Sequence, residues 1–315
     1  MKPFRFALCL LFGSLIYSNL ASAQATTEAK LQQMGIASQT LNYELAFINA
    51  NKTGIESLRY RHAHLSGKSL AQLLQMDGPR REVLLRGNEI SYFEGGLEPF
   101  TISGDHIVDS FPAVVFADFK LLSQYYNFIP VGRMRVVDRP CEVVRIVARD
   151  GSRYSYVVWL DEETRLPLRI DLMDREGDTL EQFRVISFSI SPDIQTEMAK
   201  LTEVVLPPVL ITPPAEKVSF QWQVKWVPPG FKEISRSRRN LPTLSESIES
   251  RLFSDGLFSF SINVSQIGSA TAEQMIRQGR RTIHTETRNN KEIMVVGELP
   301  PSTAKRIAAD VAVNN

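Results

Sequence analysis

The stretch LPPVLITPP, at residues 206–214, divides the sequence into two parts. Each proline fixes its own φ, lacks a backbone donor and disfavours helical backbone at the preceding residue. The stretch therefore cannot form a helix or a central strand. It is typical of a semi-rigid, polyproline-like spacer between domains, although an ordinary surface loop within one domain could also contain it. We expect two domains, and 315 residues are enough to build two cores.

The first residues have the pattern of a cleavable signal peptide. Lys2 and Arg5 precede an apolar run at residues 6–17, and the sequence ASA at residues 21–23 is acceptable to signal peptidase. The apolar run is too short to span a membrane as a helix. We expect cleavage after residue 23 and a secreted protein, most simply a periplasmic one.

Composition places the chain among globular proteins, with 43% hydrophobic and 23% charged residues. Cys141 is the one cysteine left once the signal peptide, which contains Cys9, is removed. It cannot form an internal disulfide, so both cores must be stable without one. Because Cys141 opens the apolar run CEVVRIV, we favour a small buried side chain over a reactive thiol.

Apolar residues alternate along most of the chain before the spacer, as expected for antiparallel strands. We expect short helical segments at residues 27–40, 69–76 and 118–128, the last capped by Asp118. The run RYSYVVWL is apolar on both faces of a strand, so we expect it to be covered on both. The strands are predicted from these runs: LNYELAFI, IESLRYRHAHL, REVLLRG, EISYFEGG, EPFTISG, CEVVRIVA, RYSYVVWLD, LPLRIDLMD and LEQFRVISFSI.

The part after the spacer predicts a smaller α+β domain with an antiparallel sheet. VSFQWQVKW alternates cleanly, and RLFSDGLFSFSINV is a hairpin that turns at Asp255-Gly256. RTIHTET and KEIMVVGEL form a second hairpin, and helices are expected at residues 271–279 and 302–311. We therefore predict a signal peptide at 1–23, a first domain at 24–205, a spacer at 206–216 and a second domain at 217–315.

The two parts carry opposite net charge. Residues 24–216 have a formal net charge of −6, and residues 217–315 have +5. This split indicates an acidic protein partner or a phosphorylated lipid for the second domain, although a solvated basic face would look the same. The candidate partner-binding arginines are Arg236, Arg238, Arg239, Arg277, Arg280 and Arg281.

Few residues suggest catalysis. His62 and His64 have a spacing that could hold zinc, but no further ligand cluster accompanies them. Gly67-Lys68-Ser69 resembles the end of a phosphate-binding loop without its first glycine, and no nucleophile elbow or HExxH helix is present. We expect no enzyme activity, no cofactor, no metal and no nucleic-acid partner.

Several stretches together resemble the RseB/MucB family, periplasmic regulators of the sigma-E envelope-stress response. The resemblance keeps its order over essentially the whole mature chain. It is carried by LNYELAFI, ESLRYRHAHL, QLLQMDGPRREV, RGNEISYFEGGLEPF, ARDGSRYSYVVW, TLEQFRVISF, ESRLFSDGLFSFS and VGELPPSTAKRIA.

The resemblance implies a first domain like the lipoprotein carriers LolA and LolB, a half-open antiparallel β-barrel with helices across its mouth. It also implies binding of the periplasmic part of the anti-sigma factor RseA, protection of RseA from the protease DegS, and release by lipopolysaccharide or another lipid. The alternative is a periplasmic lipid or lipoprotein carrier of the LolA/LolB type. Either could form a homo-oligomer.

A lipid ligand needs an apolar cavity, which the first sheet could provide. Candidates to line it are Tyr43, Phe47, Tyr156 and Trp159, for each of which plain core packing is the alternative. The basic second domain would then hold RseA. The limited flexibility of the spacer would let one domain influence how the other is presented.

Overall fold

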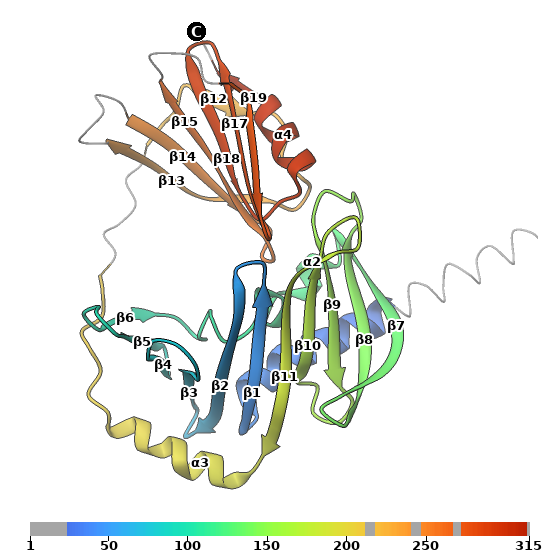
Figure 1. Ribbon diagram of the computed structural model, residues 1–315, viewed down its shortest axis with the longest axis vertical. Helices are drawn as coiled ribbons and strands as arrows, with labels where there is room; N and C mark the ends of the chain where they lie inside the picture. Colours follow the sequence, from blue (N-terminus) through green and yellow to red (C-terminus); the bar gives the residue numbers. More distant parts are fainter. Residues whose placement is uncertain (1–23, 212–217, 241–246, 267–271, 314–315) are drawn as a thin grey trace, which may run out of the picture.

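The computed structural model describes residues 24–211, 218–240, 247–266 and 272–313. The predicted signal peptide and the last part of the predicted spacer lie outside these residues. Two antiparallel sheets dominate the fold, one on each side of residues 206–211 (Figure 1). The sequence prediction of a mostly antiparallel protein is confirmed.

The first sheet has eleven strands and is open, because β6 and β7 are its two edges. The half-open barrel expected for a LolA/LolB-like domain stays a prediction. From one edge to the other the strands are β6 (Phe100–Ser103), β5 (Glu89–Glu94), β4 (Arg81–Arg86), β3 (Lys68–Gln75), β2 (Gly54–Leu65), β1 (Tyr43–Asn51), β11 (Thr179–Ile190), β10 (Pro167–Met173), β9 (Ser155–Asp161), β8 (Arg139–Ala148) and β7 (Tyr126–Val136).

A helix over residues 24–40 crosses one face of this sheet, called here the inner face (Figure 1). The Tyr43 hydroxyl donates to the Ser38 carbonyl over 2.9 Å, and Lys30 pairs with Glu142 over 2.5 Å. Leu31 and Met34 are fully buried, as their helical spacing predicts. The same core includes residues of η1 (Ala113–Phe116) and α2 (Phe119–Leu122).

Strand β9 is covered on both faces, as its sequence predicts. Tyr156, Val158 and Leu160 are at most 2% exposed and belong to the apolar core. On the other face, the guanidinium of Arg169 lies 4.3 Å from the centre of the Trp159 ring. An arginine side chain therefore covers the Trp159 ring on this face.

Three predicted helical segments differ from the structure. Residues 69–75 belong to β3, because pairing with both β2 and β4 buries Leu70 and Leu73. The helix expected at 118–128 ends with α2, since Tyr126 and Phe128 bury their rings from β7. Asp118 does cap α2 by accepting from the Leu121 N–H. Tertiary pairing outweighs local helical spacing in these segments.

The segment expected to be helical at 271–279 contains β16 (Gln274–Gln278), which pairs with β17 (Arg281–Arg288). Gly279, between them, has a φ of +58°, which permits the tight turn of a hairpin. One helix that the sequence analysis did not predict, α3 (Pro192–Ala199), follows β11 and packs against β2, and η2 (Lys200–Glu203) follows α3.

The second sheet has six strands and is covered by the terminal helix α4 (Pro301–Ala309). A two-stranded sheet, β12 (Trp222–Val224) with β19 (Val311–Val313), lies beside it. The predicted hairpin at Asp255-Gly256 is confirmed, and so is the second predicted hairpin, which turns at Asn289-Asn290. The strand order is β13 (Lys232–Asn240), β14 (Ser247–Ser254), β15 (Ser259–Gln266), β18 (Lys291–Gly297), β17 and β16.

The first residues of the spacer are attached to the edge of the first sheet. Val209 forms a parallel bridge with Thr101 of β6, and the Leu210 N–H donates to the Thr101 carbonyl over 2.7 Å. The Thr101 hydroxyl donates to the Pro207 carbonyl over 2.8 Å. Prolines are compatible with an edge position, because they need no ladder donor there.

Replacing Thr101 with valine should loosen this attachment. The variant keeps the side-chain shape but leaves the Pro207 carbonyl without its hydroxyl donor. We expect faster amide hydrogen exchange at Leu210, measured by NMR or mass spectrometry, with little change at β1. Ser103→Ala, at the exposed end of β6, is the matched control. Unchanged exchange at Leu210 in Thr101→Val would contradict the attachment.

Candidate functional site

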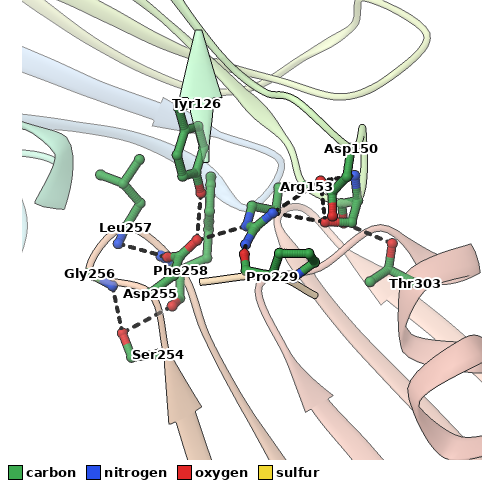
Figure 2. A network of polar contacts seen from close by, with 11 residues as sticks. Tyr126, Asp150, Arg153, Pro229, Ser254, Asp255, Gly256, Leu257, Phe258 and Thr303 are labelled. Carbon is green, nitrogen blue, oxygen red and sulfur yellow. Dashed lines mark hydrogen bonds and ion pairs between the residues drawn. The ribbon is translucent and has the colours of Figure 1, made fainter. Parts of the chain in front are cut away.

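The two domains meet at a buried ion pair between Arg153 and Asp255 (Figure 2). Arg153 precedes β9 in the first domain, and Asp255 lies at the tip of the β14–β15 hairpin in the second. The Arg153 Nε donates to Asp255 Oδ2 over 2.7 Å, and the Tyr126 hydroxyl donates to the same oxygen over 2.6 Å. Both charged side chains are 1% exposed.

The second oxygen of Asp255 is also satisfied. Its Oδ1 accepts from the backbone N–H groups of Leu257 and Phe258, over 3.0 and 2.9 Å. Figure 2 shows this carboxylate at the centre of the network, with donors from both domains around it. A buried carboxylate with this many donors holds its neighbours in a fixed geometry.

Arg153 is fixed by further groups around its guanidinium. It donates to the Asp150 carboxylate over 3.1 Å and to the Pro229 carbonyl, which belongs to the second domain. Its charged carbon also lies 5.2 Å from the centre of the Tyr126 ring and 4.8 Å from that of Phe231. Because the groups come from both domains, Arg153 fixes one domain against the other.

The Tyr126 hydroxyl remains a donor at this site. Burial raises the pKa of Tyr126 well above its ordinary value, and the negative charge of Asp255 raises it further. Tyr126 therefore stays neutral at physiological pH and keeps its hydrogen bond to the carboxylate.

A second group of contacts between the domains joins acidic and basic side chains. Arg277 pairs with Asp174 over 2.9 Å, and Arg280 pairs with Glu181 over 3.0 Å. Burial alone would raise the pKa of Asp174, but the hydrogen bond from Arg277 and its charge leave that pKa below the usual value. Part of the negative charge of the first domain is therefore paired with part of the positive charge of the second.

Neutral hydrogen bonds add to this junction. The Tyr154 hydroxyl donates to the Leu299 carbonyl over 2.9 Å, and the Thr303 hydroxyl donates to the Ser152 carbonyl over 2.8 Å. In each of these hydrogen bonds, the donor and the acceptor belong to different domains. We call the whole set of contacts made by residues 150–156, Asp174 and Glu181 with the second domain the domain junction.

The six candidate partner-binding arginines fall into three places. Arg277 and Arg280 belong to the domain junction. Arg236 and Arg238 lie on β13, where they pair with Glu233 and Glu249 but remain partly exposed. Arg239, also on β13, and Arg281, at the start of β17, are exposed. The structure thus brings three of the six together on one strand.

A pocket of about 260 Å³ adjoins β13. The rings of Phe220 and Trp222 stack at 5.5 Å between centres, with 8° between their planes. The Arg251 guanidinium lies 5.3 Å from the Trp222 ring centre, and the Trp222 Nε1 donates to Glu249 over 2.9 Å. The Trp222 side chain is only 2% exposed, so the pocket presents mainly the guanidinium groups of Arg236 and Arg251. Its lining residues are Phe220, Trp222, Gln223, Val224, Arg236 and Arg251.

The four candidate lipid-cavity residues are all buried, but they do not share one face. Tyr43 and Phe47 lie on the inner face of β1 and are 0% exposed. Cross-strand pairing through β11 and β10 puts Tyr156 on that same face. Trp159, an odd number of residues from Tyr156 on β9, faces the other way and lies under Arg169. That these residues line a lipid cavity stays a prediction.

Tyr156 borders a small cavity of about 110 Å³ close to the domain junction. Its ring stacks on Phe258 of the second domain, with 5.5 Å between centres and 13° between planes. Burial raises the pKa of Tyr156 to about 12, although the nearby charge of Arg280 acts in the opposite direction. The hydroxyl is buried without a hydrogen-bond partner among the described residues. Of the four candidates, Tyr156 is thus in direct contact with the second domain.

A cavity of about 970 Å³ in the first domain is lined by none of these candidates. It lies between the β2–β3 and β4–β5 turns, and its lining mixes Lys68 and Arg86 with Glu89 and Asp105. Arg86 already donates to the Val204 carbonyl over 2.8 Å. A polar lining of both charges is a poor match for an acyl chain.

His62 lies on β2 and Cys141 on β8, and both side chains are buried. His62 is buried beside Tyr43, and burial lowers its pKa, while His64 is exposed. No group of three or more His, Cys, Asp or Glu side chains that could hold a metal occurs among the described residues. Burial raises the pKa of Cys141 to about 11, which supports an unreactive thiol.

Sequence reasoning did not find the central pair of the junction. Asp255 was recognised as a turn residue, and nothing in the sequence links it to Arg153, 102 residues away. The sequence offered one indirect signal. Arg153 precedes a strand that is apolar on both faces, which indicates that Arg153 lies close to buried surroundings. Hydrophobic periodicity predicts local structure and therefore cannot predict a buried ion pair between two domains.

Both domains match models of the same protein family. Residues 26–205 match the family model of the MucB/RseB N-terminal domain, and residues 216–312 match that of the MucB/RseB C-terminal domain. The chain is 60% identical to the sigma-E factor regulatory protein RseB of Escherichia coli strain K12, over 99% of this chain and 98% of that protein. It is 40% identical to RseB of Haemophilus influenzae, over 99% of each.

A solved structure has the same fold. The match is to a chain from the complex structure of Pseudomonas aeruginosa MucA/MucB, with a TM-score of 0.72 and 24% identity. It covers 92% of this chain and 99% of that chain. In the described part of this chain, no helix is long and apolar enough to cross a membrane.

Removing the Asp255 carboxylate should destabilise the protein strongly. Asp255→Ala leaves the buried Arg153 with only the partly exposed carboxylate of Asp150 as a charged partner, and breaking a buried pair in this way typically costs about 3–5 kcal/mol. Chemical denaturation followed by tryptophan fluorescence would measure the loss. Arg135→Ala, which breaks an exposed pair with Asp138, is the matched control and should cost at most about 1 kcal/mol. Equal, small losses in both variants would show that the buried pair does not hold the domains.

Proposed function

Because the chain belongs to the MucB/RseB family, we propose that it binds the periplasmic domain of the anti-sigma factor RseA. Bound protein covers RseA and slows the cleavage that DegS begins, so sigma-E stays restrained. Lipopolysaccharide or another lipid releases RseA. The family match over both domains is the observation that carries this proposal, and the Pseudomonas relative was solved in complex with MucA. Removal of residues 1–23 during export would place the protein in the periplasm.

The second domain supplies the partner surface in this proposal. Its basic residues outnumber its acidic ones, and the β13 arginines are accessible in the structure. Arg277 and Arg280 are already paired with Asp174 and Glu181 of the first domain. An acidic partner would therefore contact β13 first, and it could reach Arg277 and Arg280 only by competing with those carboxylates.

Lipid control requires that the ligand favour the free form over the partner-bound form. The contacts at Tyr156 support a route for this effect. A lipid that enters the first domain beside Tyr156 would disturb its stacking on Phe258. Arg153 is three residues from Tyr156, so the same disturbance would reach the ion pair with Asp255. The domain junction would thereby transmit lipid binding to the partner surface.

The direct test is a proteolysis assay with purified components. We expect the protein to slow DegS cleavage of the RseA periplasmic domain, and lipopolysaccharide to restore the rate. The control is the effect of lipopolysaccharide on cleavage without the protein, which should be small. Absence of protection would contradict the proposal and favour the LolA/LolB-type lipid carrier.

The junction also predicts the effect of lengthening the spacer. A Gly/Ser insertion after Ile211 should leave lipid control of RseA binding largely intact, because direct contacts still set the domain arrangement. Binding would be measured by calorimetry with and without lipopolysaccharide. An equal insertion after Thr53, in an exposed turn of the first domain, is the matched control. Loss of control in the Ile211 variant alone would assign the coupling to the spacer.

A further inference from the structure

Strand β13 is an edge of the second sheet. It is nine residues long and pairs with β14 on one side, and in the described part of the chain no strand pairs with its other side. Most of its residues are exposed, including Ile234 at 58%. An edge of this length presents a row of backbone donors and acceptors to which an extended segment can pair.

The charge of β13 selects among possible occupants. The strand carries Lys232, Arg236, Arg238 and Arg239 against one acidic residue, Glu233. Basic side chains on an edge oppose pairing with a second copy of the same strand, because like charges would be placed across from each other. They favour an acidic segment, whose charges are complementary.

The pocket beside β13 supplies side-chain recognition on one face of this edge. Arg236 of β13 and Arg251 of β14 are cross-strand neighbours, and both line the pocket. The stacked rings of Phe220 and Trp222 also line it, although Trp222 is only 2% exposed. Successive residues of an added strand point to opposite faces, so every second side chain would be directed toward this pocket. The two guanidinium groups suit a carboxylate side chain.

We propose that an acidic, extended segment of the protein partner pairs with β13 as a seventh strand of the second sheet. Alternate side chains of that segment enter the pocket formed by Phe220, Trp222, Arg236 and Arg251. This inference rests on the proposed function and adds to it the binding mode and the chemistry of the recognised segment. Main-chain hydrogen bonds would provide affinity, and the pocket would provide specificity.

The start of β13 also adjoins the domain junction. Phe231 immediately precedes β13, and its ring lies 4.8 Å from the Arg153 guanidinium carbon. The same ring packs against Phe260 of β15 at 5.0 Å between centres. A segment added along β13 would therefore bind next to the residues that hold the two domains together.

Backbone pairing can be tested on the partner side, where no folding defect of this protein intervenes. Overlapping synthetic peptides from the RseA periplasmic domain would first locate an acidic segment that binds the full-length protein. That segment would then be N-methylated at one amide at a time. Strand addition predicts that affinity falls about tenfold or more at every second position and changes little between them. Losses without this alternation would overturn the proposal.

Hydrogen exchange tests the same pairing on this protein. In the complex with the whole RseA periplasmic domain, we expect amides of β13 to exchange more slowly than in the free protein. Binding without added protection at β13 would overturn the proposal while leaving the proposed function intact. Failure of the RseA domain to bind at all would instead contradict the proposed function. Self-association through β13 without RseA would assign the edge to a second copy.

Charge-reversal variants distinguish a specific effect of the β13 pocket on RseA binding from an effect of net charge alone. Arg236→Glu should weaken RseA binding about tenfold or more at low salt, because it reverses charge beside the added strand. Arg145→Glu is the matched control, since Arg145 is an exposed arginine on β8 of the first domain. Circular dichroism would verify that both variants are folded. Equal effects of the two variants would show that only net charge matters and would overturn the assignment to β13.

Discussion

The buried ion pair between Arg153 and Asp255 is the interaction on which the arrangement of the domains depends. Removing two charges from water is costly, and that cost is offset here by donors on both carboxylate oxygens and by aromatic rings on the guanidinium. Any movement that separates the domains exposes or orphans these charges together. The structure is therefore better described as two domains joined at a specific contact than as two bodies on a tether.

Opposite charge on the two domains serves two purposes in this picture. Asp174 and Glu181 bind Arg277 and Arg280 across the junction, so part of the basic surface is already neutralised within the molecule. The arginines of β13 lie outside that contact and remain accessible. The charge difference that suggested an acidic partner thus also contributes to holding the domains together. The basic residues of the second domain are thus divided between the domain junction and the exposed strand β13.

Much of the fold could be predicted from sequence because alternation and turn residues are local signals. The hairpin at Asp255-Gly256 and the doubly covered strand β9 follow from them directly. Residues 69–76 were predicted as helical from their local pattern. The prediction failed because leucines at that spacing also suit a strand that is buried between two neighbouring strands. The ion-pair partners of Arg153, Arg277 and Arg280 could not be predicted, since they depend on how distant segments of the chain meet.

The most direct test of the junction's role is a double-mutant cycle on Arg153 and Asp255, using Arg153→Met and Asp255→Asn. The quantity to measure is the affinity for the RseA periplasmic domain, with and without lipopolysaccharide, in the wild type and all three variants. If the junction transmits lipid binding, the lipid-induced change in affinity will shrink in each single variant, and the two losses will not be additive. If lipopolysaccharide weakens RseA binding equally in all four proteins, the junction does not carry the coupling.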